Sequence, residues 1–133
     1  MASRLILDTG VLIAAERGKL DLPELIGDDD PAIAAITAME LLTGVHRSEV
    51  EFRDTRALHV EALLAVLPVE NYTVEVARTH ALLAVHARRT GRPRGAFDLI
   101  IAATAAATGR TLVTGDTAAD LSELPGLAVR TLS

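Results

Sequence analysis

Short apolar runs alternate along this chain with segments of helical spacing, and this alternation is what most restricts its fold. The first run, RLIL at 4–7, ends at an acidic residue and leads into DTGVLIAAERG, a short helix closed by Gly18. Further strands are predicted around 32–35 and at 67–71, 110–115 and 127–131. Helical segments are predicted at 37–47, 49–66, 73–90, within 94–109 and, as a short turn, at 117–122. We therefore predict an α/β fold, a three-layer α/β/α sandwich with a mainly parallel central sheet of four to five strands.

Length and composition narrow the class of protein. With 133 residues the chain is expected to form a single domain over 1–133. Half of the residues are hydrophobic but only 2% are aromatic, so the core must consist of Leu, Ile, Val and Ala. No apolar run approaches the roughly 18 residues of a membrane span, and the N-terminus does not resemble a signal peptide. The absence of cysteine excludes disulfides and thiolate metal sites. We expect a soluble, cytoplasmic protein without membrane association.

The charge distribution singles out one segment. A formal net charge of −5 argues against a protein that coats nucleic acid generally. Four arginines nevertheless fall within seven residues, at positions 88, 89, 92 and 94. Such a cluster, which includes Arg92 and Arg94, can bind a phosphate backbone. The alternative is an ordinary solvated helix end and turn.

Four acidic residues occupy comparable places at strand ends and helix starts. Asp8 follows the first strand, Glu40 is expected in the first turn of the helix after the second, and Asp98 in the first turn of the helix before the fourth. Asp116 follows that fourth strand. Each has a structural explanation: Asp8 and Asp116 as N-caps, Glu40 in a capping box with Thr37, and Asp98 as a partner of the helix dipole.

The helix that contains Asp98 has an apolar stripe at helical spacing, formed by Phe97, Ile100, Ile101 and Thr104. Asp98 falls on another stripe with Ala102 and Ala105, whose small side chains would let the helix approach its neighbour closely.

Together the four acids predict more than any one of them. In open α/β sheets, sites form at the carboxyl ends of the strands, and carboxylates that converge there repel one another. A divalent cation resolves this conflict, and oxygen ligands without Cys or suitably spaced His favour Mg²⁺ or Mn²⁺. An acidic pocket beside arginines is a reasonable arrangement for hydrolysing a phosphodiester.

Three blocks of the sequence, LILDTGVLIA, TAMELLTG and GRPRGAFDLIIAATAAATGRTLVTGD, resemble PIN-domain ribonucleases, specifically the VapC-type toxins of bacterial toxin–antitoxin pairs. The resemblance covers essentially the whole chain. It implies an endoribonuclease that depends on Mg²⁺ or Mn²⁺ and cuts structured RNA such as tRNA or rRNA. It also implies a homodimer that a small VapB-type antitoxin inhibits within a hetero-oligomer, its tail filling the active site.

Carried over by position, the resemblance makes Asp8, Glu40, Asp98 and Asp116 the acidic quartet. Asp8, Asp98 and Asp116 would hold the metal, directly or through water. Glu40 would complete the shell or orient the attacking water.

The last part of the motif departs from the family. Thr114 matches the hydroxyl residue that commonly precedes the fourth acid by two. Many relatives then read Thr-x-Asn followed by Asp-Phe, whereas here Asp116 stands at the Asn position and AADL follows. Either Asp116 or Asp120 can therefore be the fourth acid. Asp116 is favoured because it lies closer to the strand end, and Asp120 is expected to support the site.

Other classes of function fit less well. A nucleotide-binding glycine loop is absent, and an aspartyl phosphatase would need an acid where Gly10 stands. The single Lys19 is misplaced for a receiver domain. The one tyrosine and two phenylalanines predict no stacking platform for single-stranded nucleic acid. The most serious alternative is a PIN-like RNA- or protein-binding module with little or no catalytic activity.

Overall fold

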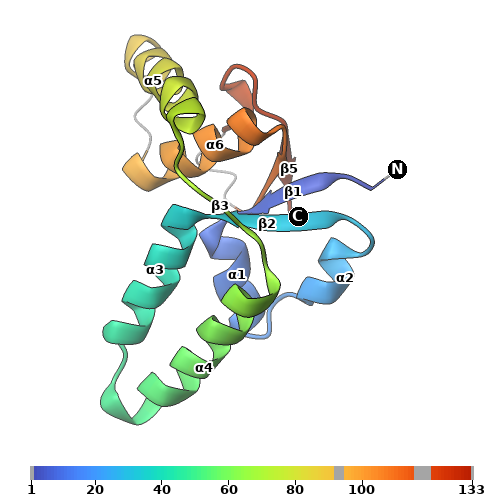
Figure 1. Ribbon diagram of the computed structural model, residues 1–133, viewed down its shortest axis with the longest axis vertical. Coiled ribbons are helices and arrows are strands. Elements are labelled where there is room, and N and C mark those ends of the chain that lie inside the picture. Colours follow the sequence, from blue (N-terminus) through green and yellow to red (C-terminus); the bar gives the residue numbers. More distant parts are fainter. Residues whose placement is uncertain (1, 92–94, 116–120, 133) are drawn as a thin grey trace.

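A five-stranded, wholly parallel sheet forms the centre of the molecule, in the order β3-β2-β1-β4-β5 (Figure 1). The computed structural model describes residues 2–91, 95–115 and 121–132. The strands are β1 (Arg4–Leu7), β2 (Asp30–Ala34), β3 (Val69–Glu70), β4 (Thr111–Thr114) and β5 (Val129–Thr131). The prediction of a mainly parallel sheet of four to five strands is confirmed.

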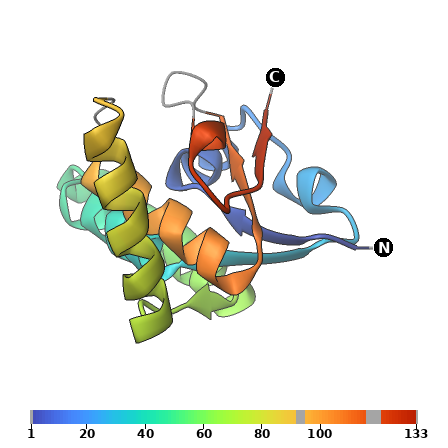
Figure 2. The ribbon, with the colours of Figure 1, turned by 90° about the horizontal axis from the view of Figure 1, so that it is seen from above.

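Helices cover both faces of this sheet, as a parallel sheet requires. They are α1 (Thr9–Glu16), α2 (Leu22–Ile26), α3 (Ala35–His46), α4 (Val50–Val66), α5 (Val74–Arg89) and α6 (Ala96–Thr108), with a 3₁₀ turn η1 at Leu121–Glu123. Helices α5 and α6 lie on one face, and α1 with the α3–α4 hairpin lies on the other (Figures 1 and 2). Among the described residues, no helix has the length and apolar composition needed to cross a membrane.

The strands alternate their side chains between two hydrophobic cores. In β1, Leu5 and Leu7 pack with α1, α3 and α4, whereas Ile6 packs with α5 and α6. All three side chains are fully buried. Burying each stabilises the fold by roughly 1.5–3 kcal/mol. The first strand of the sequence is therefore the centre of both cores.

Helix α2 is not among the predicted elements, and β2 begins at Asp30 rather than near 32; each contains a proline. Pro23 occupies the first turn of α2, where its missing N–H costs nothing. The Asp21 side chain caps the helix by accepting the Glu24 N–H at 3.1 Å. Pro31 lies within β2 and pairs with Leu5, while β3 reaches only Ile33 and Ala34. At Pro31 the strand has a neighbour on one side only, where proline is tolerated.

Helix α6 buries part of the predicted stripe, Ile101 and Thr104, together with the alanine stripe beside it. Ala102 and Ala105 are fully buried in the core with Ile6, whereas Phe97 is 44% exposed. The helix lies against the sheet on one side and α5 on the other, and methyl side chains allow that close approach. The expectation that Ala102 and Ala105 allow a close approach is confirmed. The expectation that Phe97 lies on the buried face is wrong. Gly109 ends the helix with a φ of 68°, a left-handed conformation that favours glycine.

An arginine that the sequence did not reveal as structural joins four strands. Arg110, immediately before β4, is 8% exposed. Its Nε donates to Glu70 Oε2 at 2.9 Å, and its Nη1 donates to the carbonyls of Asp30 at 3.0 Å and Leu5 at 3.3 Å. Arg110 thereby connects β4 to β1, β2 and β3.

Candidate active site

Asp8 lies at the end of the central strand, and the neighbouring strand orients its carboxylate. The Asp8 backbone N–H donates to the Val113 carbonyl at 3.0 Å, and Thr114 Oγ1 donates to Asp8 Oδ2 at 2.7 Å. Asp8 occupies the N-cap position of α1, but its side chain makes no capping hydrogen bond. The N-cap explanation therefore accounts for its backbone and not for its carboxylate.

Glu40 is oriented in the same way by a hydroxyl group from another element. Thr9 Oγ1 donates to Glu40 Oε1 at 2.7 Å, and it is also hydrogen-bonded to the Thr37 hydroxyl at 3.0 Å. Thr9 and Thr37 are both buried. Thr9 follows Asp8 directly in the sequence. The hydrogen bond from Thr9 therefore brings Glu40 to the same carboxyl edge of the sheet as Asp8.

Two details of the Glu40 prediction are wrong. Helix α3 begins at Ala35, two residues earlier than expected, so Glu40 falls in its second turn. Its N-cap is Ala34, which excludes the capping box, and Thr37 lies inside the helix facing α1. The apolar run AIAAI continues from strand into helix without a break, which explains why the boundary was misplaced.

Asp98 lies in the first turn of α6, as predicted. Its carboxylate folds back over the helix start: a Cβ placed on Gly95 would stand 3.0 Å from Asp98 Oδ2. A side chain at position 95 would therefore require the Asp98 carboxylate to shift. Phe97 borders a hollow with Glu40 and other residues of α3, so this turn of α6 lies beside the Glu40 face of α3.

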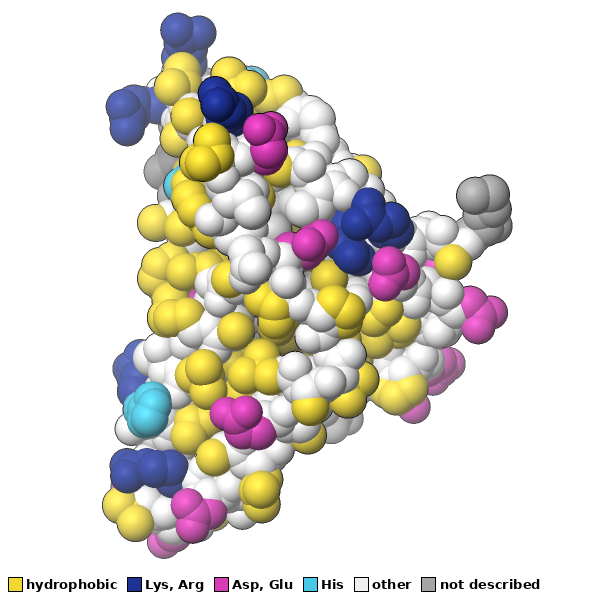
Figure 3. All heavy atoms as spheres, viewed as in Figure 1, with side chains coloured by type: hydrophobic (Ala, Val, Ile, Leu, Met, Phe, Trp, Pro, Cys, Tyr) yellow, Lys and Arg dark blue, Asp and Glu magenta, His cyan; other side chains and the backbone are white. Residues whose placement is uncertain are grey.

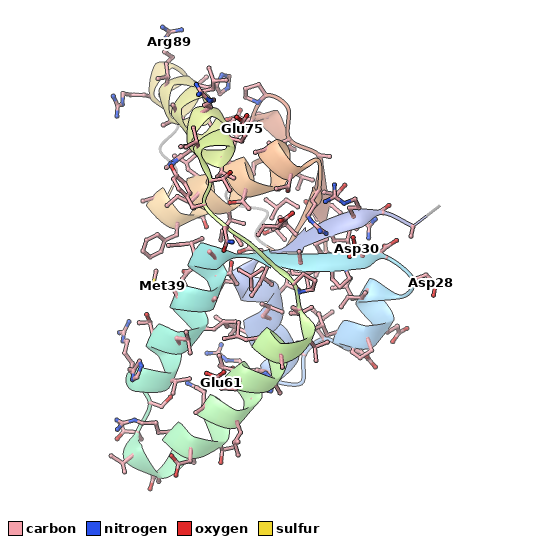
Figure 4. The ribbon with its side chains drawn as sticks, viewed as in Figure 1. Asp28, Asp30, Met39, Glu61, Glu75 and Arg89 are labelled. Carbon is pink, nitrogen blue, oxygen red and sulfur yellow. The ribbon has the colours of Figure 1, made fainter. Side chains whose placement is uncertain are left out.

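Part of the predicted site falls on residues that the structure does not describe. Asp116, Asp120, Arg92 and Arg94 lie outside the described residues. Of the arginine cluster, Arg88 and Arg89 end α5 and are exposed. Basic side chains gather over this end of α5 in Figure 3, and Arg89 projects from it in Figure 4.

The metal prediction is limited in the same way. Within residues 2–91, 95–115 and 121–132, no three His, Cys, Asp or Glu side chains group as a metal site would require. Asp116, the expected third ligand, is outside these ranges. What the described residues show is two carboxylates held by hydroxyl groups, with Asp98 at the start of a neighbouring helix.

Sequence reasoning missed Thr9, although its place directly after Asp8 was an available signal. The sequence predicts a capping role for Thr37, and this prediction is wrong because the N-cap of α3 is Ala34. The pairing of Thr9 with Glu40 spans 31 positions, which no local pattern reveals.

Comparison with known proteins agrees with this architecture. The family model described as PIN domain matches residues 5–126. Ribonuclease VapC1 of Rickettsia felis is 32% identical over 133 residues, covering 97% of this chain and 96% of that protein. Ribonuclease VapC5 of Mycobacterium tuberculosis is 35% identical over 125 residues, covering 92% and 89%.

Solved structures give the same result. The VapBC-5 toxin–antitoxin structure of Mycobacterium tuberculosis matches with a TM-score of 0.82 and 30% identity, covering 98% of this chain and 99% of that chain. VapBC2 of Rickettsia felis, solved with a DNA fragment from its promoter, matches with a TM-score of 0.87 at 23% identity, covering 98% and 99%, a likeness of fold. The extent of these matches shows that the chain belongs to the PIN domain family, among the VapC ribonucleases.

Proposed function

We propose that this chain is a metal-dependent endoribonuclease that acts as the toxin of a type II toxin–antitoxin pair. The observation that carries the proposal is the Asp8 carboxylate, which stands at the end of the central strand and is fixed by Thr114 at 2.7 Å. Carboxylates that only cap helices would be held by backbone N–H groups of their own helix. Asp8 is held from a different strand, as expected for a group whose orientation matters.

The donor chemistry fits Mg²⁺ or Mn²⁺. Asp8, Glu40 and Asp98 are partly exposed carboxylates, and hydroxyl groups orient the first two. Hard oxygen donors of this kind suit these cations. Asp8, Asp98 and Asp116 would hold the ion, with Asp120 as the alternative to Asp116. When bound, such a cation lowers the pKa of a coordinated water and neutralises charge on a phosphate.

The chain's own side chains would position the reactants. Thr114 and Thr9 fix the rotamers of Asp8 and Glu40. Glu40 would orient the attacking water from the second turn of α3, where the Thr9 hydroxyl holds its carboxylate. Arg92 and Arg94 would bind the RNA backbone without reading bases.

The partners are proposed from the relatives. Several solved relatives are toxin–antitoxin complexes, and one relative, from Shigella flexneri, is a tRNA(fMet)-specific endonuclease that is 31% identical over 85 residues. We infer that this protein acts on structured RNA such as tRNA or rRNA, forms a homodimer, and is inhibited by a cognate VapB-type antitoxin.

The proposal is tested with Asp8→Asn and Asp98→Asn, using Asp28→Asn as the matched control. The amide introduced by Asp8→Asn retains an oxygen that can accept the Thr114 hydrogen bond, so the fold should persist. We expect cleavage of a tRNA mixture in Mg²⁺ to fall by more than about 100-fold in both site variants, because even residues that only support a metal ligand cost 10–100-fold. Asp28 lies in the exposed loop before β2, away from α3, and its variant should cleave normally (Figure 4).

A second readout separates catalysis from folding. Millimolar Mg²⁺ or Mn²⁺ should raise the melting temperature of the wild type and of Asp28→Asn, because binding to the folded state stabilises it. Both site variants should lose that rise. If wild-type protein binds RNA but neither cleaves it nor responds to metal, the protein is a PIN-like binding module and the proposal is wrong.

A further inference from the structure

A hollow of about 320 Å³ lies between α3 and the first turn of α6, directly beside the proposed site. We call it the α3–α6 hollow; it is lined by Met39, Glu40, Thr43, Gly44, Arg47 and Phe97. Glu40 belongs both to this hollow and to the hydroxyl-oriented acid pair. A chain bound at Glu40 would therefore lie beside this hollow.

The hollow extends along α3 from Glu40 to Arg47, the residue that caps the helix at its carboxyl end. Glu40 and Arg47 are seven residues apart, about 10 Å along the helix axis and on the same face. Arg47 is exposed, and within the described part of the chain its side chain makes no ion pair or hydrogen bond. A guanidinium in this state, near the acids of a phosphodiester site, is placed to bind a phosphate of the substrate backbone.

An aromatic ring forms the opposite wall. Phe97 is 44% exposed, although it precedes Asp98 in a helix that otherwise buries most of its apolar side chains. Met39, 38% exposed, lies on the side of α3 that faces α6 (Figure 4). The sequence predicted no stacking platform, because the chain has only one tyrosine and two phenylalanines. A single ring beside the site is nevertheless enough to stack one base, because every base has a π-face.

Gly44 keeps the floor of the hollow open. A Cβ added at Gly44 would meet no atom within 4 Å, so the absence of a side chain is not required by packing. Glycine inside a helix costs about 0.5–1 kcal/mol relative to alanine. Arg47 and Phe97 line the same hollow.

We propose that the α3–α6 hollow binds one nucleotide of the RNA substrate next to the cleaved bond, with its base stacked on Phe97 and a phosphate at Arg47. This inference rests on the proposed endoribonuclease function and adds a subsite to it. A protein surface is the rival occupant, but the walls carry an acid and an arginine as well as apolar groups. The position beside Glu40 favours the substrate itself.

The test measures binding of a stem–loop oligoribonucleotide that carries 2-aminopurine at one loop position at a time, in EDTA so that no cleavage occurs. Quenching at one position should disappear in Phe97→Leu, which keeps apolar bulk but removes the ring, and should remain in Phe97→Tyr. Phe97→Leu should weaken binding roughly five- to hundredfold. Gly44→Gln, which fills the hollow with a good helix former, should weaken binding while Gly44→Ala does not.

The arginine is tested through salt dependence. Arg47→Gln should reduce the slope of log Kd against log salt by about 1, as expected for loss of one phosphate contact. Arg17→Gln, at the far end of α1, is the matched control and should leave the slope unchanged. In Mg²⁺, the Phe97 and Gly44 variants should raise KM more than they lower kcat, as expected for groups that bind substrate and transition state alike.

The possible failures can be told apart. If wild type cleaves RNA but Phe97→Leu and Gly44→Gln bind it as tightly as wild type does, the subsite is wrong and the endoribonuclease proposal stands. If those variants instead change the sedimentation of the protein without changing RNA affinity, the hollow is a protein interface and the subsite is again wrong. If wild type neither binds nor cleaves RNA, the proposed function fails first, and the subsite fails with it.

Discussion

Each of the two described acids at the end of the sheet is held by a threonine from a different element. Thr114 donates to Asp8, and Thr9 donates to Glu40, both at 2.7 Å. Hydrogen bonds to charged groups are shorter and about twice as strong as neutral ones, so they hold a carboxylate in one rotamer. At the scale of single residues, the site therefore consists of acid–hydroxyl pairs.

Thr114→Val tests one such pair. Valine keeps the shape of the side chain at a position that is 1% exposed, so the core should remain filled. Without the hydroxyl, Asp8 loses its orienting donor, and we expect RNA cleavage or metal affinity to fall about 10- to 100-fold.

Thr104→Val is the control for that variant. Thr104 is also 1% exposed, but its hydroxyl donates to the Ile100 carbonyl of its own helix at 2.7 Å. It should lose comparable stability and keep its activity. Equal losses of activity in the two variants, measured at the same fraction folded, would contradict the role of Thr114.

Sequence alone identified the acids but not what holds them. Asp8 and Asp98 could be placed because strand ends and helix starts follow from local hydrophobic spacing. The Thr9–Glu40 and Thr114–Asp8 pairs depend on which strands are neighbours, and strand order is not a local property. The sequence indicates Thr114 as a site residue only through the family resemblance, and it does not indicate Thr9.

At the scale of elements, α6 shows where periodicity fails. Of the stripe that has the spacing of a buried face, Ile101 and Thr104 are buried but Phe97 is 44% exposed, and the neighbouring alanine stripe is buried as well. Periodicity assumes one buried face, whereas α6 lies between the sheet and α5 and is covered on two sides. In such a helix, small side chains mark the closest contact better than large ones do.

Ala102→Leu tests that packing. Ala102 has no exposed surface, and adding three carbons there should destabilise the fold by about 1–3 kcal/mol through overpacking. Urea denaturation measures the change in the free energy of unfolding. Ala96→Leu, on the exposed first turn of the same helix, is the control and should change it by less than about 0.5 kcal/mol. Equal effects would mean that α6 does not pack as tightly as described.

At the scale of the whole molecule, Arg110 connects the start of β4 to β1, β2 and β3. It lies close to Glu70 and Asp30 and donates to two main-chain carbonyls. Nothing in the sequence marked this arginine, because its partners are 40 and 80 or more positions away. Local hydrophobic spacing predicted the strands, but the polar link between them depends on tertiary neighbours.

Arg110→Met should destabilise the protein by about 2–4 kcal/mol. The variant loses the ion pairs with Glu70 and Asp30 and the hydrogen bonds to two main-chain carbonyls. The cost is reduced because both carboxylates are partly exposed to water and keep Arg4 at 3.9 Å. Arg78→Met provides the control, since Arg78 is exposed and pairs only loosely with Glu75 at 3.7 Å. Adding Glu70→Gln to Arg110→Met should recover part of the loss in urea denaturation; no recovery would show that the carboxylate was not the cause.

The amino end of the chain is tied to the last strand by one carboxylate. Asp29 accepts the Ser3 N–H at 2.8 Å, and Arg130 of β5 lies 3.4 Å away. The backbone hydrogen bond from Ser3 is the main cause that lowers the pKa of Asp29, and the Arg130 side chain adds to it. Because the pKa is lower in the folded state than in the unfolded chain, this contribution to stability is complete above the unfolded value of about 3.9 and is lost as pH falls through the lower folded value.

Asp29→Asn should therefore flatten the acid side of the stability profile. Thermal unfolding between about pH 5 and pH 2 measures it, and the two proteins should converge as the pH falls. Asp28→Asn, one residue away and exposed, should follow the wild-type curve. A wild-type profile for Asp29→Asn would show that the Ser3 and Arg130 contacts do not persist in solution.

The hydrogen bond from Thr114 to Asp8 joins residues 106 positions apart, and β1 has β4 as one of its two neighbours. Synthesis of the chain must therefore proceed through Thr114 before this hydrogen bond can orient the Asp8 carboxylate. The orientation of Asp8 thus depends on the pairing of two strands that are far apart in the sequence.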